Sequence, residues 1–307
     1  MENISYIPIE MWQEISSHLN FISNIKLKRV CKRFEFLKIY NLNSNETSCF
    51  KKLDDNIIQR YPFIKNLSVN QNPNITNLNH LKNSLQILHC SSYPGLGNWF
   101  SGINDYGIKD LDLFELYANN NVSIKNINHF NNLRILHAVG ECGIEDYSIR
   151  NLNLIELDAS SNPKITSVNH MSKLKILLAN NYCGIDDNGI KQCMNLIRLE
   201  INWNSKITDL NHLTNLQILF ADSDACNLGD EGIAHLRNLI HLTAFGNRRL
   251  KNINHLTKLQ ILNAGIEMGY DDIKDLNLIE LYTYNIEQIK EKPNMTNLKK
   301  FIAYDCC

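Results

Sequence analysis

The chain repeats one short pattern of apolar and polar positions from residue 62 to its end. The pattern is Leu-x-x-Leu-x-Leu/Ala, whose alternating apolar residues predict a β-strand with one buried face. Six short units centre on Leu67, Leu116, Leu157, Leu199, Leu242 and Leu281. Six longer units begin at Leu85, Leu133, Leu174, Leu216, Leu259 and Leu298. Because one such unit cannot bury its apolar face alone, the alternation predicts a stacked repeat array.

The phrase Asn-His-[apolar]-x-x-Leu-x-Ile-Leu marks the long units and occurs five times. Its copies start at Asn79 (with one extra residue before the leucine), Asn128, Asn169, Asn211 and Asn254. Five histidines at one repeat position raise the hypothesis of a metal site. However, copies two strands apart start about 10 Å from one another, whereas metal ligands converge to about 2 Å from one ion. We therefore interpret the phrase as a structural turn, with asparagine as a cap and histidine bonded to the backbone.

Each strand pattern leads into a turn with its own polar position. Five short units place asparagine there: Asn72, Asn121, Asn162, Asn204 and Asn247. Three long units place a cysteine there instead: Cys142, Cys183 and Cys226. An amide or a weakly donating thiol at this point can satisfy backbone groups left open where a strand ends. In the long units, aspartate before an apolar i, i+3/i+4 pattern predicts a short N-capped helix.

These features together resemble the leucine-rich repeat, whose signature is Leu-x-x-Leu-x-Leu-x-x-Asn/Cys-x-Leu. The resemblance covers residues 62–307, in about twelve alternating short and long units. It implies an α/β fold built as a horseshoe-shaped solenoid. Parallel strands are then expected on the concave face, and short helices or turns on the convex face.

The first forty residues have a different pattern. A helix is predicted after Ile7-Pro8, with apolar residues at positions 11, 12, 15 and 19. Residues 25–37 predict one or two further short helices, with basic residues clustered between 26 and 33. A unit this small holds little core and should rely on a partner or on the repeats. Residues 41–61 are predicted as a polar linker followed by a helix over 54–61 that seals the first repeat.

Residues 1–40 resemble the F-box. Its pattern is matched in order and spacing by a Pro-x-Glu start, by Ile15 and Leu19, and by Leu27-x-x-Val30-Cys31-Lys32-Arg33-Phe34. The usual opening Leu-Pro is Ile7-Pro8 here, and Ser23-Asn24 replaces the usual acidic residue before the second helix. An F-box joined directly to leucine-rich repeats is a common architecture of that family. Two other interpretations are a polar cap of the array and a basic helix face, either solvated or weakly binding nucleic acid.

The resemblance to F-box/leucine-rich-repeat proteins implies a substrate receptor of a Skp–cullin–F-box ubiquitin ligase. The N-terminal helices would dock on the Skp-type adaptor, and the repeats would hold a protein target near the ubiquitin-charged enzyme. Apolar residues on so small a unit are the expected adaptor contacts: Pro8, Ile9, Ile15, Leu19, Leu27, Val30 and Cys31. The alternative is an interaction scaffold whose N-terminal helices only cap the solenoid.

Target recognition is expected at outward-facing positions that differ between the repeats. On the strands these are Tyr117, His137, Asp158, Arg198, Glu200, Phe220, His241 and Tyr282. A second candidate is the longer loop between Ser91 and Gly107, where Trp99 and Phe100 supply aromatic side chains. The alternatives are sequence drift on an unused face and a tolerated insertion that packs against its neighbour.

Composition narrows the class of partner and the compartment. The net charge of −1 provides no field for nucleic acid or an anionic membrane, so neither is an expected partner. Nine cysteines without a secretory signal or a transmembrane stretch favour a reduced intracellular setting, cytoplasmic or nuclear. Because the sequence has no phosphate loop, metal-ligand pair or nucleophile elbow, we expect no enzyme activity, metal or cofactor.

Overall fold

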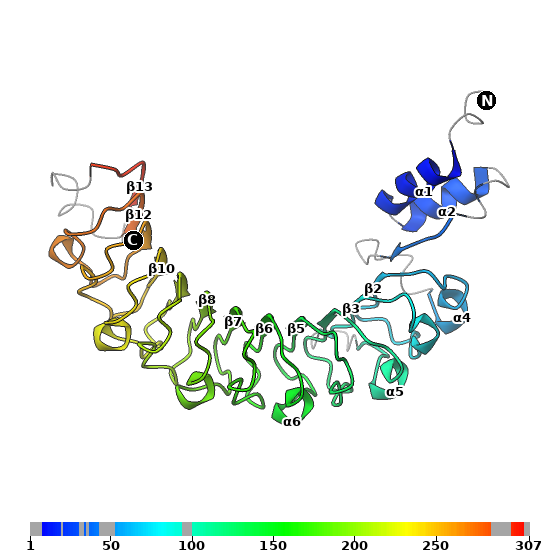
Figure 1. Cartoon of the computed structure of the whole chain (residues 1–307), viewed down its shortest axis with the longest axis horizontal. Coiled ribbons are helices and arrows are strands. Elements are labelled where there is room, and N and C mark those ends of the chain that lie inside the picture. Colours follow the sequence, from blue (N-terminus) through cyan, green and yellow to red (C-terminus); the bar gives the residue numbers. More distant parts are fainter. Residues whose placement is uncertain are drawn as a thin grey trace. The chain divides into compact units, whose positions relative to one another are not determined.

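The computed structural model describes residues 8–19, 21–30, 34, 37–42, 53–93, 100–283 and 296–303. The chain divides into two compact units, Met1–His137 with Glu141–Ile144, and Ala138–Gly140 with Glu145–Cys307. In each unit parallel strands follow one side, and short helices and turns follow the other (Figure 1). The first unit also carries α1 and α2, which are the longest helices among the described residues.

The helical pair of the first unit consists of α1 (Ile9–His18) and α2 (Phe21–Val30). Pro8 occupies the N-cap of α1, where proline is tolerated because no intrahelical N–H partner is needed. A buried contact joins the helices: Ser16 Oγ donates to Asn24 Oδ1 at 2.5 Å, and Asn24 Nδ2 donates to the Ser16 carbonyl at 2.9 Å. These bonds fix the angle between the two helices.

The pair is tied to the first strand by polar contacts from α1. Gln13 Nε2 donates to the Lys38 carbonyl at 2.9 Å, and the Lys38 N–H donates back to Gln13 Oε1 at 2.7 Å. Asn41 Nδ2 donates to the Ser17 carbonyl at 2.9 Å. Asn41 opens β1 (Asn41–Leu42), which pairs in parallel with β2 (Asn66–Ser68). The sheet therefore starts inside the segment predicted as a linker, because two residues are too few to show a strand period.

The next element, α4 (Asp55–Ile58), is shorter than the helix predicted over 54–61. Asp54 caps it, since its Oδ1 accepts the Ile57 N–H at 2.9 Å. The chain turns after Ile58 and does not continue the helix, because it must reach Asn66 to begin β2.

The remaining strands of the first unit are β3 (Ile87–His89), β4 (Glu115–Tyr117) and β5 (Ile135–His137). Those of the second unit are β6 (Glu156–Asp158), β7 (Ile176–Leu178), β8 (Arg198–Glu200), β9 (Ile218–Phe220), β10 (His241–Thr243), β11 (Ile261–Asn263), β12 (Glu280–Thr283) and β13 (Lys300–Ala303). Within each unit neighbouring strands pair in parallel with their central residues aligned, as in Leu67↔Leu88 and Leu157↔Leu177. This arrangement confirms the predicted parallel-strand solenoid.

The core of each unit is a row of leucines, one from the centre of each strand from β2 to β12. Each of the following is 0 % exposed: Leu67, Leu88, Leu116, Leu136, Leu157, Leu177, Leu199, Leu219, Leu242, Leu262 and Leu281. Burying one such side chain contributes about 1.5–3 kcal/mol. The residues that flank these leucines are mostly half-buried, so they form an outward row, called the strand face below. The period-2 pattern predicted this orientation, and the burial confirms it.

The short helices lie in the long units, as predicted. They are α5 (Asp105–Ile108), α6 (Asp146–Ile149), η4 (Asn188–Ile190), η5 (Asp230–Ile233) and η6 (Tyr270–Asp272), and η3 (Asn79–Leu81) covers the first Asn-His phrase. Three of them carry a glycine that the packing demands. A Cβ on Gly107 would lie 2.0 Å from the carbonyl oxygen of Thr76, a Cβ on Gly189 would lie 2.2 Å from that of Thr166, and a Cβ on Gly232 would lie 2.1 Å from that of Thr208. The glycine lets the helix touch the backbone of the neighbouring unit.

The repeated asparagines of the short units satisfy buried backbone groups, which confirms their predicted role. Asn162, fully buried, donates from Nδ2 to the Ala138 carbonyl at 2.9 Å and accepts the Lys164 N–H on Oδ1 at 3.0 Å. The same arrangement recurs at Asn72, Asn121, Asn204 and Asn247. Each amide links its own turn to the preceding unit.

The Asn-His phrase is also structural, as predicted. His170 Nε2 lies 3.0 Å from the Ile149 carbonyl, and three other copies repeat this contact: His129 with Ile108, His212 with Ile190, and His255 with Ile233. Asn169 Nδ2 donates to the Asn188 carbonyl at 2.7 Å, and Asn169 Oδ1 accepts the Gln192 N–H at 2.8 Å. The phrase therefore joins each long unit to the helical turns before and after it.

Candidate protein-interaction site

The helical pair presents apolar side chains to solvent. On α1, Met11 is 56 % exposed and Ile15 is 40 % exposed, and four residues of separation place them on one helix face. Val30, at the end of α2, is 65 % exposed. Of the other predicted adaptor contacts, Pro8 is exposed, Ile9, Leu19 and Leu27 are half-buried, and Cys31 lies outside the described residues.

The apolar positions of α1 divide between two sides. Trp12 turns inward, with its ring centroid 4.7 Å from that of Phe34. Met11 faces outward beside Ile15, although it was not among the predicted adaptor contacts. The i, i+4 spacing from Ile15 could have identified it.

In the first unit the strand face carries an aromatic row. The rings of His89 and Tyr117 stack with centroids 4.1 Å apart and planes 6° apart, and Tyr117 meets His137 at 4.6 Å. The Tyr117 hydroxyl donates to Glu115 Oε2 at 2.9 Å. Burial lowers the pKa of His89, and the charge of Glu115 opposes this only in part. The row therefore unites two predicted residues, Tyr117 and His137, with His89, which was not predicted.

In the second unit the strand face joins four of the predicted residues. Arg198 forms an ion pair with Glu200, and its guanidinium lies 5.1 Å from the centre of the Phe220 ring. The Phe220 ring in turn lies 5.2 Å from that of His241. The pKa of His241 is lowered by burial and by the nearby charge of Arg198. A cation, a carboxylate and two rings thus meet on β8, β9 and β10.

The other predicted residues of this face stand apart from that cluster. Asp158 on β6 accepts the Ser160 N–H on Oδ1 at 3.0 Å. Tyr282 on β12 donates its hydroxyl to Glu280 Oε2 at 2.9 Å, the same contact that Tyr117 makes with Glu115. In the loop after β3, Phe100 is exposed, and Trp99 lies outside the described residues.

A second aromatic site lies where the strands of the second unit end, and it was not predicted. Trp203 is 57 % exposed and has a φ of 61°, while Tyr182 is 86 % exposed. Both line a pocket of about 360 Å³, together with Pro163 and Lys206. Such a φ is unfavourable for a bulky side chain.

The left-handed position recurs through the repeats, four residues after the central leucine. The other described copies with a positive φ hold glycine, which has no Cβ, or a smaller polar residue: Gln71, Asn120, Gly140, Ser161, Asn181, Ser223 and Gly246. Trp203 is the exception, and an aligned comparison of the repeats could have found it. Strain at an exposed aromatic residue is a reason to test it for function.

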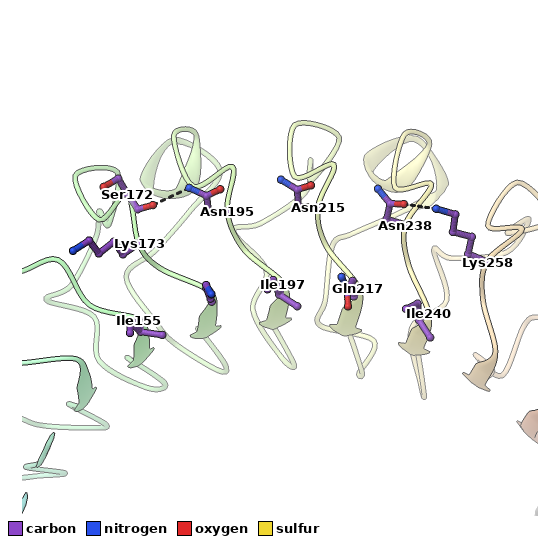
Figure 2. A pocket seen from close by; sticks show the side chains of 11 residues that line it. Ile155, Ser172, Lys173, Asn195, Ile197, Asn215, Gln217, Asn238, Ile240 and Lys258 are labelled. Atoms are coloured by element: carbon purple, nitrogen blue, oxygen red, sulfur yellow. Dashed lines mark hydrogen bonds between the residues drawn. The ribbon is translucent and has the colours of Figure 1, made fainter. Parts of the chain in front are cut away.

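A groove in the second unit also escaped prediction. It has a volume of about 770 Å³ and follows the starts of the strands in the second unit (Figure 2). Its floor contains Ile155, Ile197 and Ile240, and asparagines of the preceding turns form its wall. On the strands, the predicted recognition residues flank the central leucine, whereas these isoleucines lie one position earlier.

The repeated cysteines are buried, as predicted for structural thiols. Cys142, Cys183 and Cys226 are 0 % exposed. Burial raises the pKa of Cys183 and of Cys226 to about 11, so these thiols stay protonated at neutral pH. Within the part of the chain that the structure describes, no three histidine, cysteine or acidic side chains gather as metal ligands. None of the described helices is both long and apolar enough to cross a membrane.

Comparison with known proteins identifies the N-terminal module. The F-box domain model matches residues 4–37. A search of the curated proteins found no match. Among solved structures, the internalin InlF of Listeria monocytogenes is 21 % identical, with a TM-score of 0.47 over 74 % of this chain and 76 % of that one. The functional domain of InlJ from Listeria monocytogenes is 17 % identical, with a TM-score of 0.47 over 81 % of this chain and 60 % of that one.

The chain thus carries an F-box domain, followed by a parallel-strand solenoid whose repeated sequence pattern resembles the leucine-rich repeat. F-box domains in general bind Skp-type adaptors and belong to the ubiquitin pathway. Both kinds of module typically serve interaction and not catalysis.

Proposed function

We propose that this protein is the substrate receptor of a Skp–cullin–F-box ubiquitin ligase. The observation that carries the proposal is the direct joining of an F-box domain to a repeat array with an exposed, varied strand face. The protein would bring a target close to the ubiquitin-charged enzyme, and proximity would supply the rate enhancement. We expect it to act inside the cell, in the cytoplasm or the nucleus.

The exposed apolar side of the helical pair supports adaptor docking. Met11 and Ile15 on α1 and Val30 on α2 are exposed in the free chain, and covering each would contribute about 1–2 kcal/mol. We add Met11 to the expected contacts, which are Pro8, Ile9, Ile15, Leu19, Leu27, Val30 and Cys31. The bonds between Ser16 and Asn24 would hold these residues in place before docking.

The strand face is the proposed site for a protein target. Its two clusters contain arginine and aromatic residues, which are enriched in binding hot spots. In the first unit the cluster is the row of His89, Tyr117 and His137. In the second unit it is the set of Arg198, Glu200, Phe220 and His241. Mixed charge and ring surface of this kind suits recognition of a folded protein or a peptide, and not of a membrane.

The adaptor assignment is tested by purifying the full chain with a Skp-type adaptor. The variant Met11→Asp with Ile15→Asp should lose the adaptor, because two carboxylates would be buried in an apolar contact. Glu14→Ala changes an exposed residue of the same helix and should keep the adaptor. If the wild-type chain never binds the adaptor, or the double aspartate variant binds it equally well, the ligase role is wrong.

The alternative is an interaction scaffold whose helical pair only caps the repeats. The double aspartate variant separates the two functions within one chain. A receptor should bind an adaptor–cullin complex in size-exclusion chromatography and lose it in this variant, while partners of the repeats remain bound. A scaffold should give the same elution profile with and without adaptor–cullin complex.

A further inference from the structure

The groove at the strand starts of the second unit has a regular floor. The residue just before each strand, from β6 to β10, is in turn Ile155, Lys175, Ile197, Gln217 and Ile240. Short units supply the isoleucines, and long units supply the polar residues between them. Figure 2 shows Ile155, Ile197 and Ile240 along the line of strand starts.

Backbone hydrogen bonds fix the spacing of this floor at the residues that line it. The Lys175 N–H donates to the Ile155 carbonyl at 2.9 Å, and the Ile197 N–H donates to the Lys175 carbonyl at 2.8 Å. The next two steps repeat the contact, Gln217 to Ile197 at 2.9 Å and Ile240 to Gln217 at 2.8 Å. Neighbouring strands are about 4.8 Å apart, so the isoleucines recur every ~9.6 Å.

The wall of the groove is held by amides of the preceding turns. Asn195 Nδ2 donates to the Ser172 carbonyl at 2.8 Å, and Asn215 Nδ2 donates to the Met194 carbonyl at 3.0 Å. Asn238 Oδ1 accepts a bond from Lys258 Nζ at 2.7 Å, as drawn in Figure 2. Because these side chains are already positioned, a ligand would lose little free energy in ordering them.

The charged side chains that line the groove are all positive. Lys173, Lys175 and Lys258 line the groove, and none of its lining residues is acidic. A groove with isoleucines below and lysines beside them is complementary to a ligand that alternates apolar and acidic groups.

The repeat length of the floor distinguishes between peptide conformations. A polyproline II helix places equivalent side chains every ~9.3 Å. An extended strand does so every ~6.8 Å, and seven residues of α-helix span about 10.5 Å. Over the two steps from Ile155 to Ile240, the polyproline II repeat drifts from the isoleucines by only about 0.6 Å, against about 1.8 Å for the helix.

We propose that this groove binds a proline-rich peptide segment in the polyproline II conformation, with an apolar residue at every third position and acidic residues between. Such a segment exposes its backbone and is already extended, so docking costs little conformational entropy. The inference rests on the proposed function only in assigning the segment to a target of the repeats. Binding of the peptide can be measured without an adaptor.

The test uses the full-length chain and a fluorescein-labelled peptide with the sequence (Leu-Pro-Glu)₃. Fluorescence anisotropy should show saturable binding. Ile197→Asp, in the middle of the floor, should weaken it about tenfold or more, because a buried isoleucine contact is lost. Lys175→Glu should weaken it about fivefold at low salt and less at high salt. Ile279→Asp alters the equivalent position outside the groove and should leave the affinity unchanged.

A second peptide tests the repeat length itself. One glycine inserted after each Leu-Pro-Glu triplet keeps the charges and apolar residues but breaks the three-residue period, and it should bind about tenfold more weakly. Melting temperatures and adaptor binding are measured on every variant, so that misfolding and failure of the proposed function are recognised separately. Equal affinity for the two peptides, no binding of the first, or an Ile197→Asp effect matched by Ile279→Asp would overturn the proposal.

Discussion

The Asn-His phrase and the strand face differ in where their polar atoms are directed. In the phrase, Asn169 bonds to the helical turn of the next unit, and His170 bonds to the turn of the previous one. On the strand face, His89 and Tyr117 bond or stack with side chains of the same row and remain accessible. Residues that are identical in every copy therefore join the units, and residues that vary face outward. We therefore expect the repeated residues to govern stability, and the residues that depart from the repeat to be the ones available for recognition.

The largest predicted effect on the free energy of unfolding comes from a substitution in the buried turn of a short unit. Asn204→Ala should lower the free energy of unfolding by about 3 kcal/mol, because the Ala179 carbonyl and the Lys206 N–H would both lose their buried partner. Urea titration followed by circular dichroism measures it. Asn215→Ala, at an exposed turn, should cost less than about 1 kcal/mol. Equal costs at the two sites would contradict the distinction between joining and outward positions.

The next largest effect on stability is expected from substitutions in the Asn-His phrase. Asn169→Ala should cost about 1–2 kcal/mol, because it removes bonds to the Asn188 carbonyl and the Gln192 N–H at a partly exposed site. Asn211→Ala should cost a similar amount, since Asn211 makes the equivalent bonds to Glu231 and His235. The same urea titration applies. A change in adaptor or peptide affinity without a change in stability would show that the phrase takes part in recognition.

Trp203 extends this comparison, because it differs from the residues at the equivalent positions of the other repeats and its backbone φ is unfavourable for a bulky side chain. Trp203→Asn should leave the free energy of unfolding equal or raise it by up to about 1 kcal/mol, since asparagine accepts a positive φ more readily. Binding of a target that uses this pocket should weaken in the same variant, whereas Trp203→Phe should keep both properties near wild type. A clear loss of stability in Trp203→Asn would instead make the ring a packing residue.

The smallest effect is a dependence of stability on pH. Burial lowers the pKa of His89 and of His241, so each takes up its proton at lower pH in the folded chain than in the unfolded chain. Their contribution to stability is complete above pH ~6.5 and declines as the pH falls below it. Urea midpoints at pH 7.5 and 5.5 should show this decline, and His89→Gln with His241→Gln should reduce it. Greater stability of the wild type at pH 5.5 than at pH 7.5 would contradict this prediction.

Much of the fold could be predicted because the local spacing of apolar residues indicates which face of each strand is buried. The alternation around Leu157 predicted a strand, and the constant spacing to Asn162 predicted an inner turn that the structure confirms. The two-residue strand β1 could not be predicted, because it is shorter than any periodic signal and is fixed by pairing with β2 and by the contact of Asn41 with α1.

The candidate sites were harder to predict than the fold. Sequence patterns named Arg198, Phe220 and His241 as outward residues, but their meeting depends on strands that are about twenty residues apart in the chain. Trp203 was missed because a single residue type does not reveal its φ. The groove was missed because its floor takes one side chain from just before each of five strands, and only stacking brings these positions together.

The sequence by itself determined the alternation of short and long units, the buried leucines and the turn asparagines, because each of these follows from spacing within about twenty residues. It also determined the F-box, whose motif is local. Tertiary structure decided which variable side chains become neighbours: the rings of His89, Tyr117 and His137, and the isoleucine floor. The physical reason is that stacking of parallel strands brings equivalent positions of successive units within about 4.8 Å, whatever residues occupy them.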